Sequence, residues 1–306
     1  MVSRSERVLI TGGCGFTGCV LAERLRIDGY EVVALSRDGA DASALTIDLC
    51  DLDRLVPPLS QVHPNVIVHL AGVSAPSHEK IDEIYKANVI GTANLFAAMT
   101  MAKVEPRLVV VASSAQIYAT GNANAPLTEE SPLAPKSHYA VSKRATEDIA
   151  AIYRDHFPII VTRPFNYTGP SQSQTFLVPK IVQHYVERRS EIRLGRIDLS
   201  RDFSDIQRVV EAYSRLVSGS ISSTTVNICS GRAIRLMDIL GIMEEISGHA
   251  LKIVTDVSLI RDNEPDIIVG SATRLEALVG PLPNPEFRET LFRMYKACTE
   301  QINAGR

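Results

Sequence analysis

The sequence lacks a long apolar run, a surplus of basic residues and any repeated or low-complexity segment. No run approaches the ~20 apolar residues that a membrane-spanning helix needs, so we expect no membrane association. The net charge of -3 gives no basic field that would favour nucleic acid or an anionic membrane as a partner. With 45% hydrophobic and 22% charged residues, the composition is that of an ordinary globular protein.

Paired or clustered cysteines are also missing. The five cysteines are odd in number and scattered, so they show no metal-ligand spacing and predict no metal site. A disulfide between Cys14 and Cys19 would distort a glycine-rich turn and the helix expected after it. Residues 1–13 run straight into a strand, which leaves no room for a signal peptide. We therefore expect a reduced, cytoplasmic protein.

The first half of the chain alternates short β-branched runs with helical patterns. The β-branched runs predict strands at 7–11, 31–35, 66–72, 107–113 and 158–164. The helical patterns predict helices at 19–28, 52–59, 81–101 and 139–155. Pro57 and Pro58 are expected to stop the second helix. Strands that alternate with helices predict an α/β fold with a Rossmann-type doubly wound parallel sheet. Strands without polar alternation fit burial on both faces.

After Pro164 the pattern changes, and a second structural unit is expected. The predicted elements are a loop at 165–174, helices at 176–189, 205–218 and 236–248, and short strands at 193–203 and 224–230. The 306 residues are enough for two domains. We predict a larger domain at 1–164, to which 202–232 returns, and a smaller C-terminal α/β lobe formed by 165–201 and 233–306.

Gly12, Gly15 and Gly18 form a GxxGxxG turn between the first predicted strand and helix. Glycine permits a tight turn and the close approach of backbone to a diphosphate. The N–H groups at the start of the helix then face the anion. Such a turn can also serve only to pack a helix on a strand, but its position favours binding of a nicotinamide dinucleotide.

The end of the second strand bears on which dinucleotide binds. An acid there would bond the ribose 2′-hydroxyl of NAD, whereas an arginine favours a 2′-phosphate. Ser36 stands at the expected acid position and Arg37 follows it, which favours NADP(H). NAD(H) stays possible because Asp38 comes next. Asp48 and Leu49, after the following apolar segment, suit the adenine edge.

Tyr139 and Lys143 form a Tyr-x-x-x-Lys pair, one helical turn apart on the same face. An ammonium beside a phenol favours the phenolate, so we expect Lys143 to lower the pKa of Tyr139 and to fit it for proton transfer. Ser114 ends the strand before this helix. Taken singly, these residues are more often a packing tyrosine, a surface lysine and a helix cap. Together with the glycine turn, they indicate a hydride-transfer site.

Taken together, these motifs resemble the extended short-chain dehydrogenase/reductase family. The matching segments cover nearly the whole chain and lie at 11–18, 48–49, 69–72, 88–92, 113–118, 139–143 and 163–170. Segments 163–172, 195–206 and 226–231 resemble the GDP-4-keto-6-deoxy-D-mannose reductase group, whose close relatives are the GDP-mannose 4,6-dehydratases. The stretch 261–271 resembles the Arg-x-x-Glu segment with which those enzymes hold the nucleotide.

The resemblance implies a role for each candidate residue, with the larger domain binding NAD(P) and the smaller lobe binding a GDP-linked 4-keto-6-deoxy sugar. Tyr139 would protonate the sugar O4 as hydride arrives, Lys143 would bond the nicotinamide ribose, and Ser114 would polarise the carbonyl. The implied cofactor contacts are Gly12, Gly15, Phe16, Thr17, Gly18, Ser36, Arg37, Asp48, Leu49, Leu70, Ala71, Gly72, Asn88, Tyr139, Lys143 and Pro164. The implied substrate contacts are Ser114, Gln116, Asn166, Lys180, Arg196, Arg201, Arg261 and Glu264.

Some of these contacts also have a simpler structural interpretation. Asn88 would bond backbone near Lys143, or be a buried amide that is satisfied locally. Arg201 and Arg261 would clamp the substrate phosphates through their guanidinium forks, or form surface ion pairs. Glu264 would accept hydrogen bonds from ribose hydroxyls, or remain a solvated charge.

The favoured reaction is NAD(P)H-dependent reduction of the C4 keto group of GDP-4-keto-6-deoxy-D-mannose to GDP-D-rhamnose. The same residues would give GDP-6-deoxy-D-talose if the sugar presented its other face. The 4,6-dehydratases carry an acid–base carboxylate where Ala115 and Gln116 stand, and an amide cannot transfer the proton. The 4-epimerases usually have an acid after the second strand, unlike this chain. A non-catalytic nucleotide sensor is disfavoured because both Tyr139 and Lys143 are present.

Two predicted helices, 81–101 and 139–155, are apolar on more than one face. In the resembled family such helices pair across a two-fold axis, so the resemblance implies a homodimer. The same apolar residues could instead pack wholly within one subunit.

Overall fold

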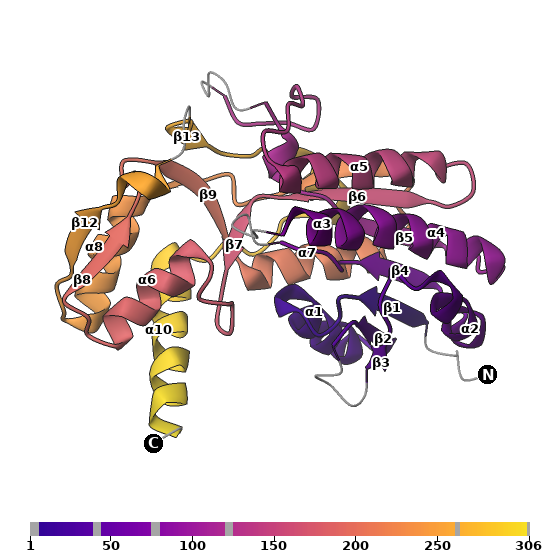
Figure 1. The fold of residues 1–306 in the computed structure, drawn as a ribbon, viewed down its shortest axis with the longest axis horizontal. Helices are drawn as coiled ribbons and strands as arrows, with labels where there is room; N and C mark the ends of the chain where they lie inside the picture. The colour runs from indigo at the N-terminus through magenta and orange to yellow at the C-terminus, as the bar shows by residue number, and fades with distance from the viewer. Residues whose placement is uncertain (1–5, 39–43, 75–79, 120–124, 261–263, 305–306) are drawn as a thin grey trace.

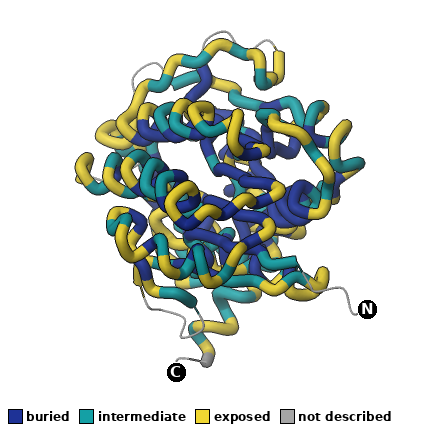
Figure 2. Tube along the Cα trace, turned by 90° about the vertical axis from the view of Figure 1, so that its right-hand side faces the viewer, coloured by how far each residue is buried: buried dark blue, intermediate teal, exposed yellow. Residues whose placement is uncertain are grey.

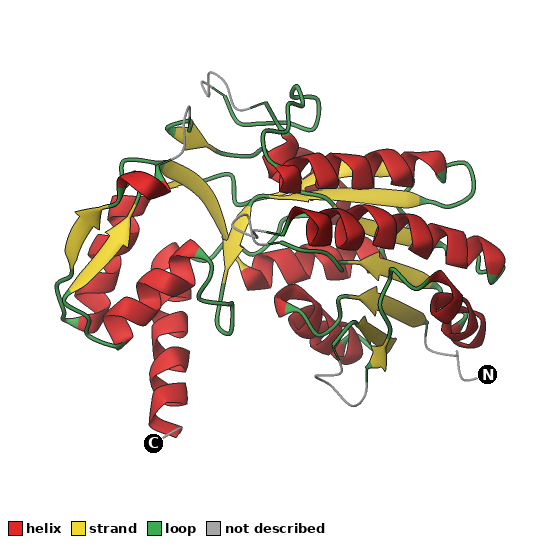
Figure 3. Ribbon diagram, in the orientation of Figure 1, coloured by secondary structure: helices red, strands yellow, loops and turns green. Residues whose placement is uncertain are grey.

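The computed structural model of the chain describes residues 6–38, 44–74, 80–119, 125–260 and 264–304. Its centre is a parallel sheet of seven strands in the order β10-β6-β5-β4-β1-β2-β3 (Figures 1 and 3). The strands are β1 (Arg7–Thr11), β2 (Glu31–Ser36), β3 (Leu45–Thr46), β4 (Val66–His69), β5 (Leu108–Ala112), β6 (Ile159–Pro164) and β10 (Thr224–Ile228). The predicted α/β fold with a doubly wound parallel sheet is confirmed.

Helices cover both faces of this sheet. They are α1 (Phe16–Ile27) and α7 (Ile206–Ser218) on one side, and α2 (Leu52–Val62), α4 (Gly91–Met101) and α5 (His138–Ile152) on the other. Successive side chains of a strand point to opposite faces. Along β5, Leu108 and Val110 therefore pack in the core on the α1 and α7 side, whereas Val109 and Val111 pack in the core on the α2, α4 and α5 side. Both faces are therefore buried, and Figure 2 shows the buried trace enclosed by more exposed segments.

A smaller lobe follows β6, on the left of Figure 1. Its elements are β7 (Asn166–Thr168), α6 (Leu177–Val186), β8 (Glu191–Leu194), β9 (Ser200–Asp205), β11 (Ala233–Arg235), α8 (Leu236–Ser247), β12 (Lys252–Thr255), β13 (Ile267–Ile268) and α10 (Phe287–Ala304). Helix α9 (Thr273–Val279) instead packs against α7 and β10 of the large sheet. Strand β9 pairs with β7, β11 and β13, and β8 pairs with β12. The chain re-enters the large sheet through α7 and β10, which lies parallel to β6. Within the described ranges, none of the helices has the length and apolar character needed to cross a membrane.

Two local expectations are wrong, and a third needs refinement. Helix α2 continues through Pro57 and Pro58 to Val62, because buried Leu55 and Leu59 hold it against the sheet despite the lost N–H donors. The helix expected at 81–101 is confirmed with those bounds, but it changes type along its length, from α3 (Ile81–Tyr85) through a π-helical turn η1 (Lys86–Ile90) to α4. The loop expected at 165–174 contains β7, because pairing with β9 orders it.

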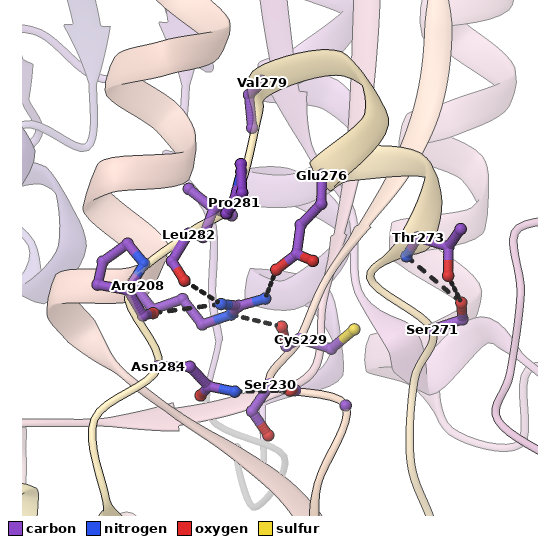
Figure 4. Close-up of polar contacts among 12 residues, drawn as sticks. Arg208, Cys229, Ser230, Ser271, Thr273, Glu276, Val279, Pro281, Leu282 and Asn284 are labelled. Carbon is purple, nitrogen blue, oxygen red and sulfur yellow. Dashed lines mark hydrogen bonds and ion pairs between the residues drawn. The ribbon is translucent and has the colours of Figure 1, made fainter.

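Arg208 joins the large sheet to the C-terminal segment (Figure 4). Its side chain is buried on α7, where Nε donates to the Cys229 carbonyl at 2.7 Å. The other nitrogens donate to the carbonyls of Leu282 and Pro283, at 3.1 and 3.2 Å, and to Glu276 Oε1 on α9, at 2.7 Å. One guanidinium therefore satisfies acceptors from three separate parts of the chain.

Candidate active site

The glycine turn after β1 is shaped for close approach. Gly12 has a φ of +70°, and a Cβ there would lie 2.8 Å from the Ala71 backbone. A Cβ on Gly18 would lie 2.2 Å from the Gly12 carbonyl oxygen. Gly15 is the N-cap of α1 and has no side chain to satisfy the N–H groups of the first turn. These groups, which include those of Phe16 and Thr17, are thus directed at the turn, and the cradle fits a dinucleotide diphosphate.

Ser36 and Arg37 lie at the end of β2, where the sequence predicts them. Ser36 Oγ donates to the Asp38 carbonyl at 3.0 Å, and Arg37 Nε pairs with Asp38 Oδ1 at 3.2 Å. The Arg37 side chain is 63% exposed, so it is free to turn toward a 2′-phosphate, but Asp38 competes for it. Asp48 Oδ1 accepts the Cys50 N–H at 2.8 Å, and the Leu49 carbonyl accepts from Asn94 at 2.9 Å, which fixes the segment expected at the adenine edge.

Tyr139, Lys143 and Ser114 come together at the carboxyl edge of the sheet. Ser137 caps α5 by accepting the Ala140 N–H at 3.1 Å, which places Tyr139 in the first turn of the helix. Tyr139 and Lys143 are only 8% and 6% exposed. Ser114 follows β5, and the Tyr139 hydroxyl forms a hydrogen bond with it. Lys143 Nζ donates to the Ala112 carbonyl, at the end of β5, at 2.9 Å.

The expected lowering of the Tyr139 pKa is not seen. Burial raises the pKa of Tyr139 to about 12, although the hydrogen bond with Ser114 acts in the opposite direction. Burial also lowers the pKa of Lys143 to about 8. Loss of solvent around the phenol thus dominates the pKa of Tyr139, and the ammonium of Lys143 is itself desolvated. At neutral pH Tyr139 holds its proton, which is the form that a general acid requires.

Asn88 and Gly72 lie against Lys143. Asn88, in the π-helical turn, is buried; its Oδ1 accepts the Val73 N–H at 2.8 Å and its Nδ2 donates to Ser142 Oγ at 2.9 Å. A Cβ on Gly72 would lie 2.5 Å from Asn88 Oδ1 and 3.3 Å from Lys143 Nζ. The loop after β4, which also carries Leu70 and Ala71, therefore passes between the asparagine and the lysine, and Asn88 both bonds backbone near Lys143 and is satisfied locally.

The predicted substrate contacts fall into separate groups. Arg201 on β9 donates to Glu264 Oε1 at 2.8 Å, and Arg196 donates to the Glu264 carbonyl at 3.0 Å, so these three lie together. Lys180, on α6, instead donates to the Arg193 carbonyl at 3.1 Å.

The remaining predicted contacts lie nearer the catalytic residues in the chain. Gln116 is exposed one residue after Ala115, and exposed Asn166 donates to the Asp202 carbonyl at 3.3 Å. Pro164 ends β6 beside Ile228. Arg261 lies outside the described residues.

Tyr167 is a site residue that the sequence interpretation missed. Its hydroxyl lies 2.9 Å from Thr17 Oγ1, and its ring stacks on Phe16 with centroids 6.1 Å apart. Tyr167 also contributes, after burial, to the raised pKa of Tyr139. The alternation of apolar and polar residues from Phe165 to Thr168 could have indicated the strand that carries Tyr167.

Asp202 was missed as well. It is fully buried on β9, where its carboxylate accepts the N–H groups of Ser230, Gly231 and Gly270 and the Ser230 hydroxyl, at 2.6–3.2 Å. Burial raises the pKa of Asp202, while these hydrogen bonds act in the opposite direction. The contacts fix β9, and with it Arg201, to the loop after β10. A lone aspartate in a strand gives no sequence signal for this role.

Comparison with known proteins adds independent evidence. The family model described as NAD dependent epimerase/dehydratase family matches residues 8–229. A GDP-6-deoxy-D-talose 4-dehydrogenase from Aggregatibacter actinomycetemcomitans is 34% identical over 90% of this chain and 91% of that protein. A GDP-6-deoxy-D-mannose reductase from Pseudomonas aeruginosa is 27% identical over 94% of this chain and 95% of that protein. The solved structure of RMD from Pseudomonas aeruginosa with NADPH superposes with a TM-score of 0.85 at 27% identity, covering 97% of this chain and 98% of that chain.

Proposed function

Because this chain belongs to the NAD dependent epimerase/dehydratase family, we propose that it uses NAD(P)H to reduce the C4 keto group of GDP-4-keto-6-deoxy-D-mannose. The observation that carries the proposal is the buried Tyr139, bonded to Ser114 and one turn from Lys143, beside the glycine cradle. The names of the relatives, a GDP-6-deoxy-D-talose 4-dehydrogenase and a GDP-6-deoxy-D-mannose reductase, support a GDP-linked 6-deoxy sugar as substrate.

Each catalytic residue has one task in this proposal. The bound dinucleotide supplies the hydride that reaches C4. Ser114 donates a hydrogen bond to the carbonyl oxygen and polarises it, and Tyr139 gives that oxygen its proton, so that the product is an alcohol. Lys143 carries the charge that stabilises the phenolate left on Tyr139, with its ammonium oriented by the Ala112 carbonyl.

Reduction is favoured over dehydration by the state of the nearby carboxylates. Elimination of water needs a free carboxyl to move protons, and Ala115 and Gln116 supply none. Glu147, one turn beyond Lys143, places both of its oxygens on the buried Arg163 guanidinium at 2.8 Å. Its carboxylate is thereby committed to an ion pair between α5 and β6.

The C4 configuration of the product gives two candidates. The sequence resemblance favours the rhamno product. The 34% identity to a GDP-6-deoxy-D-talose 4-dehydrogenase favours the talo product, which that reaction run in reverse would give. We propose GDP-D-rhamnose as the leading product and GDP-6-deoxy-D-talose as the second candidate, both formed by the same catalytic residues.

We also propose NADP(H) as the preferred cofactor, with Arg37 released from Asp38 to meet the 2′-phosphate; the NADPH bound to the Pseudomonas relative supports this.

In the proposed division into domains, 1–164 with 202–232 binds the dinucleotide, and 165–201 with 233–306 binds the sugar nucleotide. Cys14, Cys50, Cys229 and Cys298, all within the described residues, are free thiols, which fits the proposed reducing cytoplasm.

We further propose a homodimer formed through α3, η1, α4 and α5. These helices pack side by side and expose Ile81, Ile90, Met101, Val141 and Ile152. Apolar side chains exposed on neighbouring helices favour a partner surface of the same kind. Light scattering should give twice the chain mass of 33.4 kDa, and Ile90→Glu should halve it. A wild-type protein at the single-chain mass would overturn this assignment.

The function is tested by supplying GDP-4-keto-6-deoxy-mannose, made with a separate dehydratase, together with NADPH or NADH. Loss of nicotinamide absorbance is expected, faster with NADPH, and proton coupling constants then assign the C4 configuration. Consumption only with UDP- or dTDP-linked 4-keto sugars would show that the proposed base is wrong. No consumption with any 4-keto sugar would reject the reaction itself.

A further inference from the structure

A line of buried polar side chains runs beneath the glycine turn. Thr11 ends β1, His69 ends β4 and Thr92 lies in the first turn of α4, and all are at most 2% exposed. His69 Nδ1 lies 2.7 Å from Thr11 Oγ1, and its Nε2 lies 2.9 Å from Thr92 Oγ1. None of the roles derived above uses this imidazole.

The direction of every hydrogen bond in this line can be assigned. Thr92 Oγ1 donates its one proton to the Asn88 carbonyl at 2.6 Å, so toward His69 it can only accept. The His69 proton is therefore on Nε2, and Nδ1 accepts from the Thr11 hydroxyl. Thr11 Oγ1 in turn accepts the Ala71 N–H at 3.3 Å. Burial, with a smaller contribution from the Lys143 charge, lowers the pKa of His69 to about 3, so the ring is neutral.

Both ends of this line reach groups of the candidate active site. At one end is Ala71, in the loop after β4 that borders the glycine cradle. At the other end is the Asn88 carbonyl in η1, which lies 3.0 Å from the Thr146 hydroxyl of α5; that hydroxyl shares its one proton with the Ser142 carbonyl, also at 3.0 Å. The Asn88 amide bonds Ser142, whose hydroxyl donates to the Tyr139 carbonyl at 2.8 Å.

The line of hydrogen bonds from Thr11 to the Asn88 carbonyl ends in the π-helical turn η1. Gly91 N–H donates to the carbonyl of Lys86 five residues earlier, so the helix is locally widened at Asn88. Such turns are rare and frequently accompany functional sites. Hydroxyls of Thr92 and Thr146 meet the Asn88 carbonyl from two different helices, which fixes the turn relative to α5.

We propose that His69 is a positioning residue, a neutral Nε2–H imidazole that ties the cofactor edge of the sheet to the π-helical turn and thereby sets the place of Tyr139 and Lys143. The effect of His69 on turnover rests on the proposed function. The protonation state and the contacts of His69 are independent of that function.

The first experiment determines the tautomer and the charge of the His69 ring. Protein labelled with ¹⁵N-histidine is studied by long-range ¹H–¹⁵N correlation, and His69→Gln identifies the resonance. The expected pattern is a neutral Nε2–H tautomer that does not titrate between about pH 5 and 8. An Nδ1–H tautomer, or an imidazolium within that range, would overturn the proposal. This measurement needs no substrate, so its outcome is independent of the proposed reaction.

The second experiment compares Thr92→Val, which keeps the β-branched shape but removes the hydroxyl, with Thr92→Ser, which keeps the hydroxyl. Thr92→Val should lower kcat about tenfold and shift the alkaline limb of its pH profile, with little change in KM for the sugar; Thr92→Ser should stay within about twofold of wild type. Equal kcat values and pH profiles in the two variants, whatever their melting temperatures, would reduce His69 to a structural residue and contradict the proposal.

Discussion

At the scale of single residues, Tyr139 is the centre of the account. Its phenol is buried, bonded to Ser114 and protonated at neutral pH. The sequence predicts its identity because Tyr-x-x-x-Lys is a local spacing on one helix. The sequence does not predict its pKa, because the desolvation comes from elements that are distant in the chain.

Tyr139→Phe should lower kcat by roughly 10²–10⁴-fold, because phenylalanine keeps the ring but removes the transferred proton. Dinucleotide binding, measured by calorimetry, should stay near the wild-type value. Tyr153→Phe at the end of α5 is the matched control, since its ring packs on Phe96 and that contact survives the change. Similar rates for Tyr139→Phe and the control would exclude the tyrosine as the acid.

The rate should fall as pH rises through about 8. Burial lowers the pKa of Lys143 to about 8, so above this value the amine loses the charge that stabilises the phenolate of Tyr139. The pH profile of kcat/KM for the free enzyme measures this directly. A profile that stays flat to about pH 10, the ordinary lysine range, would contradict it.

Tyr167 should contribute to dinucleotide binding through Thr17. Tyr167→Phe removes the hydroxyl but keeps the ring on Phe16, and Thr17→Val removes the other half of the same hydrogen bond. Each variant should weaken NADPH binding by about three- to tenfold, consistent with a net hydrogen-bond contribution of ~1 kcal/mol. The double variant should be no weaker than either single one. Strictly additive losses would show that the two hydroxyls act separately.

At the scale of elements, the glycine turn, β4 and α5 were predictable because their signals are contiguous in the chain. The π-helical turn was not, and for β7 the sequence offers only the short alternation from Phe165 to Thr168, which does not reveal its partner strand. The widening at Asn88 accompanies contacts with Thr146 and Ser142 on another helix, and β7 exists through its pairing with β9. Local pattern carries no information about either partner.

Gly72→Ala tests the packing of the loop after β4. The added Cβ would lie 2.5 Å from Asn88 Oδ1 and 3.3 Å from Lys143 Nζ, so the asparagine must move away from the Val73 N–H. We expect kcat to fall at least tenfold. Gly241→Ala is the control: a Cβ there meets nothing within 4 Å, and alanine in the interior of α8 should raise stability by ~0.5–1 kcal/mol. An unchanged kcat in Gly72→Ala would refute the close approach.

At the scale of the whole molecule, segments distant in the chain are joined by buried polar residues that sequence reasoning did not single out. Arg208 and Asp202 each collect partners from segments far apart in the chain. Arg201, a predicted phosphate clamp, bonds Glu264, a predicted ribose contact, and this pairing depends on how β9 lies beside the segment before β13. Sequence motifs identify such residues but not their partners.

Arg208→Met should destabilise the fold by about 3–5 kcal/mol, because the carbonyls of Cys229, Leu282 and Pro283 lose a buried donor and Glu276 loses its partner. Chemical denaturation measures this free energy. Arg193→Met removes a solvent-exposed ion pair with Glu191 and should change stability by less than about 1 kcal/mol. Equal effects of the two substitutions would show that Arg208 is not an anchor.

The central claim, hydride delivery to C4 of a GDP-linked 4-keto-6-deoxy sugar with proton delivery to O4, is tested most directly with NADPH carrying deuterium at the transferred position. Deuterium in the product is located by NMR. The account predicts label at C4 alone, with the wild-type protein and not with Tyr139→Phe over the same interval. Label at C5 or C6, or a product formed without label, would mean that the protein does not reduce this carbonyl.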